Sequence, residues 1–239
     1  MLVLALDTTT RGGSCALARD RLTLHQSAGD PARPHDLRLP GDLQSLLDAS
    51  GQPLDAVDVF AVATGPGSFT GLRIGIATMQ GLAFAAGKPL IGVSGFDALA
   101  RVAADTSPDF PGNDRIDRAP LVATWVDAWR GEVFTALYED GEELEAPTVE
   151  HPEAVLSRLR GRPTVFVGDG AAQHRALITA TMGTLARIAE PVSPLLAGTI
   201  AAMAVDVIAA GHAPAPHAIR PLYVKRPAVE LVRDARPVR

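Results

Sequence analysis

The sequence contains a single cysteine, Cys15, among its 239 residues. One cysteine excludes an internal disulfide framework and any metal site that is built from a cluster of cysteines. We expect Cys15 to be a small buried residue on a strand rather than a reactive thiol. Paired histidines are also missing, because none of the six histidines stands in an H-x-x-x-H or H-E-x-x-H pattern. We therefore predict no metal site.

Long apolar runs are absent as well. The apolar residues at the N-terminus stop at Asp7 and have no basic segment or cleavage site beside them. They indicate a buried strand rather than a signal peptide. The longest weakly polar stretch, 72–87, is interrupted by Arg73 and Gln80 and is too short to cross a bilayer. We expect a soluble cytoplasmic protein with no membrane contact.

Positive charge is not in excess. Lys and Arg number 22 against 27 Asp and Glu, which gives a formal net charge of −5. Nucleic-acid affinity depends mainly on clustered cations, so the chain by itself should bind phosphate backbones poorly. The hydrophobic content of 47% is sufficient for a proper core. At roughly 150 residues per domain, the length fits one large domain or two small lobes.

Apolar spacing and turn residues predict the elements of the first half. We expect strands at 2–6, 14–18, 22–26, 57–63 and 90–93, and helices at 71–87 and 95–104. Another helical face is formed by Leu39, Leu43, Leu46 and Leu47 and ends at Gly51, which places Pro40 in the first turn. The chain thus begins with an antiparallel or mixed meander and continues with alternating helices and strands.

The second half predicts a smaller αβ lobe. Prolines and Gly112 make a composition break at 106–117, where we place the boundary between the lobes. Beyond it we expect strands at 121–126, 132–138 and 164–167, and helices at 153–159 and 171–181. Ser193 as N-cap, Pro194 and Gly211 bracket a last helix. The predicted units are lobe 1–105 completed by helix 193–211, lobe 106–192, and an irregular tail 212–239.

Two loops carry residue types that can bind nucleotides. Asp7, Thr8 and Thr9 follow a core strand, where amides can surround a phosphate and a carboxylate can hold Mg²⁺ through water. An ordinary hairpin turn is the alternative. The segment with Gly65, Gly67 and Ser68 joins a strand to a helix, where an anion can bind. It matches neither a Walker A loop nor a Rossmann fingerprint, and a tight turn that lets the helix pack closely is the equal alternative.

Helix 71–87 is apolar on nearly every face, and helix 194–210 repeats this pattern. Such helices are either core helices of a large domain or carry a surface for a partner chain. The candidate partner contacts are Gly71, Leu72, Arg73, Gly75, Ile76, Met79, Gln80 and Ala83. In this interpretation Met79 points outward, Gly71 and Gly75 leave room for a close helix contact, and Arg73 and Gln80 form the rim. Separately, Asp127 is either a catalytic acid or the start of a hairpin turn.

Several segments together resemble one known family. They are Leu4–Thr8, the block Gly65–Gly75, Ile91–Ser94, Asp127–Ala128 with Gly131–Phe134, and Pro221–Val224. Over residues 1 to about 226 the sequence is similar to the bacterial TsaB (YeaZ) family of tRNA threonylcarbamoyladenosine synthesis. Two positions depart from the family pattern. Asp36 and Leu37 follow His35 where His-Ser-Glu is common, and Trp129 stands where an arginine is usual.

The resemblance implies an α/β chain with the actin-like ATPase fold of sugar kinases and Hsp70, in which two lobes are each built on a mixed sheet with flanking helices. It implies a non-catalytic scaffold or dimerisation subunit that binds and activates the TsaD-type catalytic subunit. That subunit adds threonylcarbamoyl to N6 of adenosine 37 in tRNAs that read codons beginning with A.

The implied partners are the TsaD-type subunit, a TsaE-type ATPase, tRNA through the complex, and a second copy when the chain is alone. No catalytic residue and no cofactor of its own are expected, and ATP or ADP with Mg²⁺ would bind only within the complex. The alternative is an ATP-dependent kinase or ATPase of the same superfamily. Such an enzyme needs an acid and phosphate loops from both lobes. Residues 167–170 offer a candidate adenosine-side loop, but no convincing acid is predicted to face Asp7.

Overall fold

The computed structural model describes residues 1–106 and 120–224. Its strands are β1 (Leu2–Asp7), β2 (Ser14–Arg19), β3 (Leu22–Ala28), β4 (Val59–Ala63), β5 (Leu90–Val93), β6 (Leu121–Asp127), β7 (Val133–Glu139), β8 (Glu142–Glu150), β9 (Thr164–Val167) and β10 (Ala186–Ile188). Its helices are α1 (His35–Ser50), α2 (Phe69–Ala86), α3 (Gly95–Thr106), α4 (Pro152–Arg158), α5 (Asp169–Gln173), α6 (Arg175–Met182) and α7 (Ala197–Ala209). Single 3-10 turns lie at Leu54–Ala56, Gly183–Leu185 and Pro216–Ala218.

The strands form two five-stranded sheets with the same topology. The order is β3-β2-β1-β4-β5 in the first sheet and β8-β7-β6-β9-β10 in the second. In each sheet three successive strands pair antiparallel, and the remaining two run parallel to the first strand of that meander. This duplication places Asp7, at the end of β1, and Asp127, at the end of β6, at equivalent positions of the two lobes.

Residue size alternates along β1 and decides which helices cover each face of the first sheet. Leu2, Leu4 and Leu6 share a buried cluster with apolar residues of α1 and α2. Val3 and Ala5 point to the other face, where the cluster contains residues of α3 and α7. Since successive side chains of a strand alternate between faces, this sheet is covered by helices on both sides.

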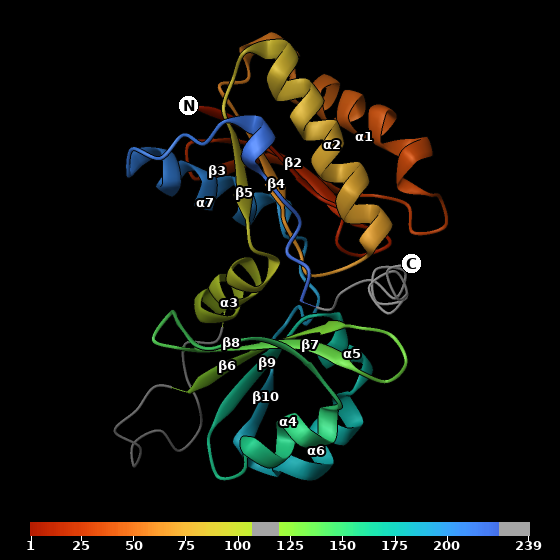
Figure 1. Cartoon of the computed structure of the whole chain (residues 1–239), viewed down its shortest axis with the longest axis vertical. Helices are drawn as coiled ribbons and strands as arrows, with labels where there is room; N and C mark the ends of the chain where they lie inside the picture. Colours follow the sequence, from red (N-terminus) through yellow and green to blue (C-terminus); the bar gives the residue numbers. More distant parts are fainter. Residues whose placement is uncertain (107–119, 225–239) are drawn as a thin grey trace, which may run out of the picture.

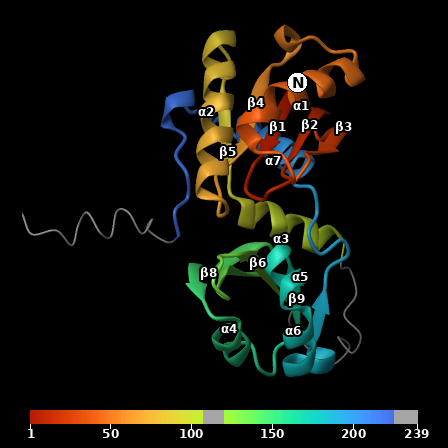
Figure 2. The ribbon, with the colours of Figure 1, turned by 90° about the vertical axis from the view of Figure 1, so that its right-hand side faces the viewer.

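Helix α3 lies between the two sheets (Figures 1 and 2). One continuous hydrophobic cluster joins Ala61 of the first sheet, Phe96 and Leu99 of α3, and Val126 of the second sheet. In addition, the hydroxyl of Tyr138 on β7 donates to Asp97 of α3 at 2.6 Å. The two lobes therefore share a core layer.

The last helix begins later than the sequence pattern predicts. The expected helix at 193–211 is observed as Ala197–Ala209, and Ser193 does not cap it. Its first amides instead bond to side chains of the first lobe. Ala197 N–H donates to Ser14 Oγ at 3.1 Å, and Gly198 N–H donates to Gln26 Oε1 at 2.8 Å. Its start is set by contacts with distant strands, so local capping signals were misleading.

The other differences between the predicted and the observed elements are smaller. Helix α1 starts at His35, so that Pro40 lies in its second turn rather than in its first. The helix predicted at 171–181 is divided into α5 and α6 at His174, where φ is −101° and ψ is 17°. Strands β8 and β10 are not predicted by the sequence pattern; every residue of β8 is at least partly exposed, and β10 has 3 residues.

The C-terminal segment returns to the first lobe and runs beside α2, as Figures 1 and 2 show in blue. We call residues 212–224 the C-terminal strap. Gln80 of α2 donates its side-chain N–H to the carbonyls of Pro216 at 2.9 Å and Ile219 at 3.2 Å. Leu222 N–H donates to the carbonyl of Thr64 at 2.7 Å. The predicted tail is therefore anchored on the first lobe as far as Val224.

The composition break at 106–117 falls almost wholly at 107–119, which lies outside the described residues, as does the tail beyond Val224. The proposed division into lobes stays a prediction. In the described part of the chain, no helix combines the length and the apolar character needed to cross a membrane.

Candidate functional site

Asp7 occupies the carboxyl end of β1, where the β1–β2 loop begins. Its Oδ1 accepts hydrogen bonds from the backbone N–H of Thr9 at 2.9 Å and from Thr9 Oγ1 at 2.6 Å. Burial raises the pKa of Asp7, and the two bonds from Thr9 act in the opposite direction. Thr8 is fully buried and donates its hydroxyl to the Gly71 carbonyl of α2 at 2.8 Å. The first loop thus turns Thr8 toward α2.

The β4–α2 loop is packed against this first loop. Ser68 N–H donates to the Thr9 carbonyl at 2.8 Å, while Ser68 Oγ accepts from Gly71 N–H at 3.2 Å and caps α2. A Cβ on Gly67, where φ is +154°, would lie 2.4 Å from the Thr9 carbonyl oxygen. The Gly65 carbonyl is also used, since it accepts from Gly95 N–H at 2.7 Å. These contacts fit the tight-turn alternative for this loop.

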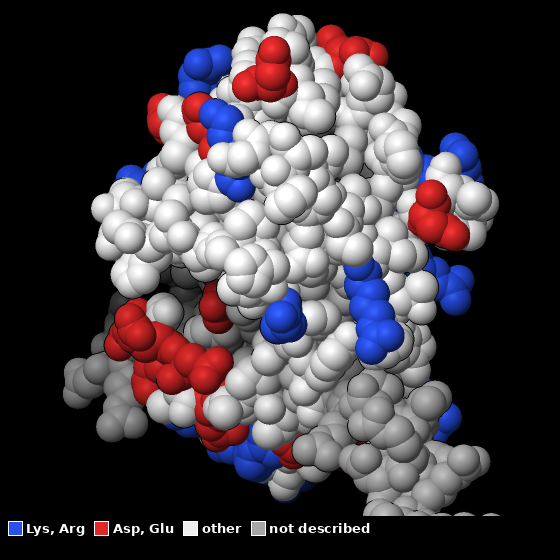
Figure 3. All heavy atoms as spheres, turned by 45° about the horizontal axis from the view of Figure 1, so that its top comes forward, with Lys and Arg blue, Asp and Glu red and all other residues white. Residues whose placement is uncertain are grey.

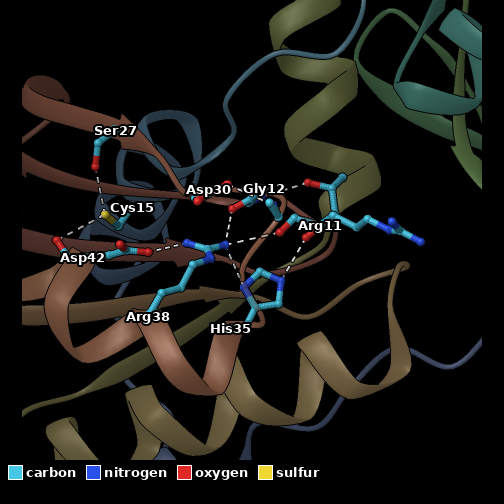
Figure 4. A network of polar contacts seen from close by, with 11 residues as sticks. Arg11, Gly12, Cys15, Ser27, Asp30, His35, Arg38 and Asp42 are labelled. Atoms are coloured by element: carbon cyan, nitrogen blue, oxygen red, sulfur yellow. Dashed lines mark hydrogen bonds and ion pairs between the residues drawn. The ribbon is translucent and has the colours of Figure 1, made fainter.

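Arg38 and His35 of α1 hold the β1–β2 loop through polar contacts (Figure 4). Arg38 donates to the Gly12 carbonyl and to the Asp42 carboxylate. It also donates to Nδ1 of His35 at 2.9 Å, so the ring proton is on Nε2, which donates to the Thr10 carbonyl at 3.0 Å. Burial lowers the pKa of His35, and the charge of Arg38 acts in the same direction. The loop is therefore held in one conformation by a neutral imidazole and a buried guanidinium.

The sequence patterns did not predict this network of Arg38, His35 and Asp42. The signal that could have found it is the spacing of Arg38 three residues after His35 and four before Asp42, which places all three on one side of a helix. Cys15 is buried nearby, and its Sγ lies 3.2 Å from Ser27 Oγ. Burial raises the pKa of the Cys15 thiol, which agrees with the prediction of an unreactive strand residue.

A cleft of ≈ 250 Å³ lies between the lobes and borders the β1–β2 loop. The first lobe lines it with Asp7 and Thr9, and the second lobe lines it with Gly168 and Asp169. Of the six predicted nucleotide contacts, only Asp7 and Thr9 line this cleft. Of the other four, Thr8, Gly67 and Ser68 take part in contacts between the two loops and α2, and Gly65 accepts a hydrogen bond from Gly95 of α3.

Asp169 is an acid that lines the same cleft as Asp7, although no acid was predicted to face Asp7. Its Oδ1 accepts from Asp127 N–H at 3.0 Å and from Gly170 N–H at 2.9 Å. Burial raises the pKa of Asp169. The signal was the Gly168–Asp169–Gly170 sequence after β9, which the topology brings to the cleft. Among residues 1–106 and 120–224, no three or more His, Cys, Asp or Glu side chains gather as metal ligands.

The predicted outward orientation of Met79 is wrong. Met79 is 0% exposed. It lies on the inner side of α2 with Ile76 and Ala83 and packs into the core of the first lobe. Gly71, Leu72 and Gly75 are buried on the same side of the helix. A Cβ on Gly75 would lie 2.1 Å from Thr8 Oγ1, so this glycine makes room for the β1–β2 loop and not for another chain. Six of the eight predicted partner contacts are therefore internal contacts.

The remaining two, Arg73 and Gln80, face the C-terminal strap. Gln80 bonds to strap carbonyls as described above, and Arg73 Nε donates to the Tyr223 hydroxyl at 3.0 Å. The face of α2 that is exposed consists of Phe69, Thr70, Arg73, Ala77, Gly81, Phe84, Ala85 and Ala86. Phe84 has an exposed fraction of 84%, the largest among the exposed large hydrophobic residues of the described chain.

Asp127 behaves as the hairpin alternative predicts. Its Oδ1 accepts from the backbone N–H of Trp129 at 2.9 Å. Trp129 and Arg130 both have left-handed backbone conformations, with φ of 59° and 58°. Ala128 N–H closes the turn by donating to the Glu132 carbonyl at 3.1 Å. This side chain shapes the β6–β7 turn.

The sequence matches the family model described as TsaD, tRNA N6-adenosine threonylcarbamoyltransferase, over residues 30–232. It is 37% identical over 179 residues to the tRNA threonylcarbamoyladenosine biosynthesis protein TsaB of Escherichia coli (strain K12). That alignment covers 71% of this chain and 72% of the relative. The chain belongs to the TsaB/YeaZ family. The family resemblance carried by the sequence motifs is confirmed, and it connects the chain with tRNA threonylcarbamoyladenosine biosynthesis.

Solved structures confirm the fold. YeaZ from Pseudomonas aeruginosa is similar with a TM-score of 0.70 and 30% sequence identity, over 93% of this chain and 100% of that chain. The activator of the 2-hydroxyisocaproyl-CoA dehydratase from Clostridium difficile, with bound ADPNP, is similar with a TM-score of 0.56 and 9% identity, over 88% of this chain and 97% of that chain. At that identity the likeness shows the fold alone. The predicted actin-like ATPase fold with two mixed sheets is correct.

Proposed function

We propose that this chain is a non-catalytic subunit that binds and activates a TsaD-type subunit, which transfers threonylcarbamoyl to N6 of adenosine 37 in tRNA. The observation that carries the proposal is the exposed face of α2. This helix of 18 residues contains a single charged residue, Arg73. An exposed helix face with almost no charge is typical of a contact surface rather than of a solvated surface.

The shape of this face also fits another helix. Ala77 and Gly81 leave a shallow surface one turn apart, and nothing lies within 4 Å of the position that a Cβ on Gly81 would take. Phe84 stands beside it as an exposed anchor. Small residues permit close approach of two helices, and a protruding aromatic side chain can supply much of the binding energy. In Figure 3 a broad uncharged surface contrasts with the acidic side chains that gather over the β7–β8 hairpin.

The arrangement of histidines supports a role without catalysis. TsaD-like relatives hold a metal with an H-x-x-x-H pair, and this sequence has no such pair. In the cleft, Asp7 Oδ1 already accepts two hydrogen bonds from Thr9, and Asp169 Oδ1 already accepts two from backbone amides. One oxygen of each carboxyl group therefore helps to hold its own loop.

The small volume of the cleft supports the proposal that the chain alone holds no nucleotide. Its volume of ≈ 250 Å³ is below the roughly 300–1,000 Å³ of ordinary ligand sites. The β4–α2 loop, which the sequence offers as the second phosphate loop, packs on the β1–β2 loop and does not line the cleft. We therefore assign no nucleotide to the chain alone. ATP or ADP with Mg²⁺ belongs, in this proposal, to the complex, which also includes a TsaE-type ATPase and tRNA.

The test uses a charge on the exposed face of α2. Ala77→Glu should keep the circular dichroism spectrum but weaken association with the TsaD-type subunit at least tenfold, about 1.4 kcal/mol, because burying the new carboxylate costs free energy even if Arg73, one turn before it, pairs with it. Sedimentation velocity measures the complex, and threonylcarbamoylation of a tRNA transcript measures activation. The same variant should dissociate any homodimer that the chain forms when alone.

Ala176→Glu on α6 is the matched control, since Ala176 is also exposed on a helix but belongs to the second lobe. It should leave association unchanged. Unchanged association of Ala77→Glu would refute the assignment of α2 as the contact surface. Modification of tRNA by the chain alone, or hydrolysis of ATP by it, would refute the non-catalytic role and support the kinase or ATPase alternative.

A further inference from the structure

Two segments of this acidic chain contain no acidic residue at all. Residues 59–96 carry Arg73 and Lys88 and no Asp or Glu, and residues 207–229 carry Arg220, Lys225 and Arg226 and no Asp or Glu. The structure places the described part of the second segment beside the first, because the C-terminal strap runs along α2 (Figure 2). Within these two segments of a chain of net charge −5, every charged side chain is therefore positive.

An aromatic and arginine cluster lies where α2 and the strap meet. The rings of Phe69 and Tyr223 are stacked with centroids 5.3 Å apart, and the Arg73 guanidinium carbon lies 3.9 Å from the Phe69 ring centroid. Arg73 Nε donates to the Tyr223 hydroxyl at 3.0 Å. Phe69 and Tyr223 both have an exposed fraction of 37%. The guanidinium is therefore held in place at the surface by uncharged groups.

Within residues 1–106 and 120–224, no acidic side chain pairs with either arginine of this face. Arg220 is exposed and donates to the carbonyls of His217 and Ile219. None of the ion pairs formed among the described residues involves Arg73 or Arg220. Each guanidinium has five N–H donors, so both retain donors that are not used by these contacts. The sequence adds Lys225 and Arg226 directly after the strap.

We propose that this face, formed by Arg73 with Phe69 and Tyr223 and by Arg220, binds the phosphate backbone of the tRNA substrate. Guanidinium groups match phosphate geometry, and a guanidinium held against aromatic rings loses less conformational entropy on binding. This inference rests on the proposed function. A chain of net negative charge binds tRNA weakly by itself, so the two arginines act by adding phosphate contacts to those that the TsaD-type subunit makes. The tRNA-binding face differs from the surface proposed to contact the TsaD-type subunit, which is the uncharged part of α2 around Ala77, Gly81 and Phe84.

The experiment is a double variant, Arg73→Gln with Arg220→Gln, in the complex with the TsaD-type subunit. Fluorescence anisotropy of a labelled tRNA transcript is followed between about 50 and 200 mM salt. We expect affinity to fall about tenfold at the low salt concentration. The slope of log affinity against log salt should decrease by about 1.5, since each lost phosphate contact removes roughly 0.7–0.9. Sedimentation should show unchanged association of the two proteins.

The control is Arg21→Gln with Arg175→Gln, which removes the same charge from exposed arginines that pair with Asp206 and Glu190. It should change neither affinity nor slope. An equal loss in the control, unchanged tRNA binding, or loss of protein association in the test variant would each overturn the proposal. If the wild-type proteins do not associate, the proposed function fails instead. The weak binding of the chain alone at low salt and high protein concentration then tests the two arginines, and equal binding by the wild type and the double variant would overturn their role.

Discussion

Arg38 stands at a position of α1 that faces the sheet and the β1–β2 loop, where an apolar residue would be usual. Its side chain is 3% exposed and pairs with Asp42, which is 28% exposed. It also donates to the Gly12 carbonyl and to His35. At the scale of single residues, a buried cation with several acceptors is costly to remove, because the acceptors remain buried without donors.

We therefore predict that Arg38→Ala lowers the free energy of unfolding by about 3 kcal/mol. Urea denaturation followed by circular dichroism measures the change. Arg175→Ala is the control, because that arginine pairs with Glu190 at the surface and should contribute no more than about 0.5 kcal/mol. Equal effects of the two variants would show that the Arg38 network does not stabilise the loop.

At the scale of elements, α2 has two sides that are distinguished by its glycines. Gly75 lies on the buried side, where a Cβ would meet Thr8 Oγ1 at 2.1 Å and two other Thr8 atoms at 3.1 Å. Gly81 lies on the exposed side with open space around it. Replacement of glycine by alanine favours a helix, so the same substitution should have opposite effects at these two positions.

Gly81→Ala should raise the free energy of unfolding by about 0.5–1 kcal/mol. Gly75→Ala should lower it by about 2 kcal/mol, since the clash with Thr8 displaces either the helix or the β1–β2 loop. Thermal and urea denaturation compare the two variants directly. Stabilisation by both would mean that α2 is not packed against Thr8 as closely as these distances indicate.

At the scale of the whole molecule, the two sheets are coupled through α3. The hydrophobic cluster that contains Phe96 and Leu99 extends into both lobes without interruption. The Tyr138 hydroxyl adds a hydrogen bond to Asp97 across the same layer. Burial raises the pKa of Tyr138, so its hydroxyl stays protonated and remains a donor at neutral pH. Two lobes that share a buried core layer should not unfold independently.

We predict one cooperative unfolding transition. Both tryptophans, Trp125 and Trp129, belong to the second lobe, so their fluorescence reports on that lobe while far-ultraviolet circular dichroism reports on all helices. The two urea curves should coincide. Tyr138→Phe should lower stability by about 1–3 kcal/mol, because it leaves Asp97 without this donor, and the curves should still coincide. Separate transitions in the wild-type chain would show that the lobes are independent.

Much of the element order could be predicted because it depends on local patterns. The run of β1 up to Asp7, the leucine spacing of α1, and Gly51 and Gly87 at helix ends are signals that act within a few residues. The tight β4–α2 turn and the Asp127 hairpin were also among the alternatives that the residue types allowed. Strands β8 and β10 were not predicted. Strand β8 is an exposed edge strand and β10 has 3 residues, and neither shows a clear hydrophobic period.

The sequence by itself determined the family, the two-sheet α/β fold and the apolar character of α2, because residue type and spacing carry that information. Only the tertiary structure decided which side of α2 is buried: an all-apolar helix has no preferred side until Thr8 packs at Gly75. It also decided where α7 starts, through the Ser14 hydroxyl on a distant strand. In the same way it brought Asp169 to the cleft of Asp7 and Tyr223 to Arg73, pairs that lie 162 and 150 positions apart.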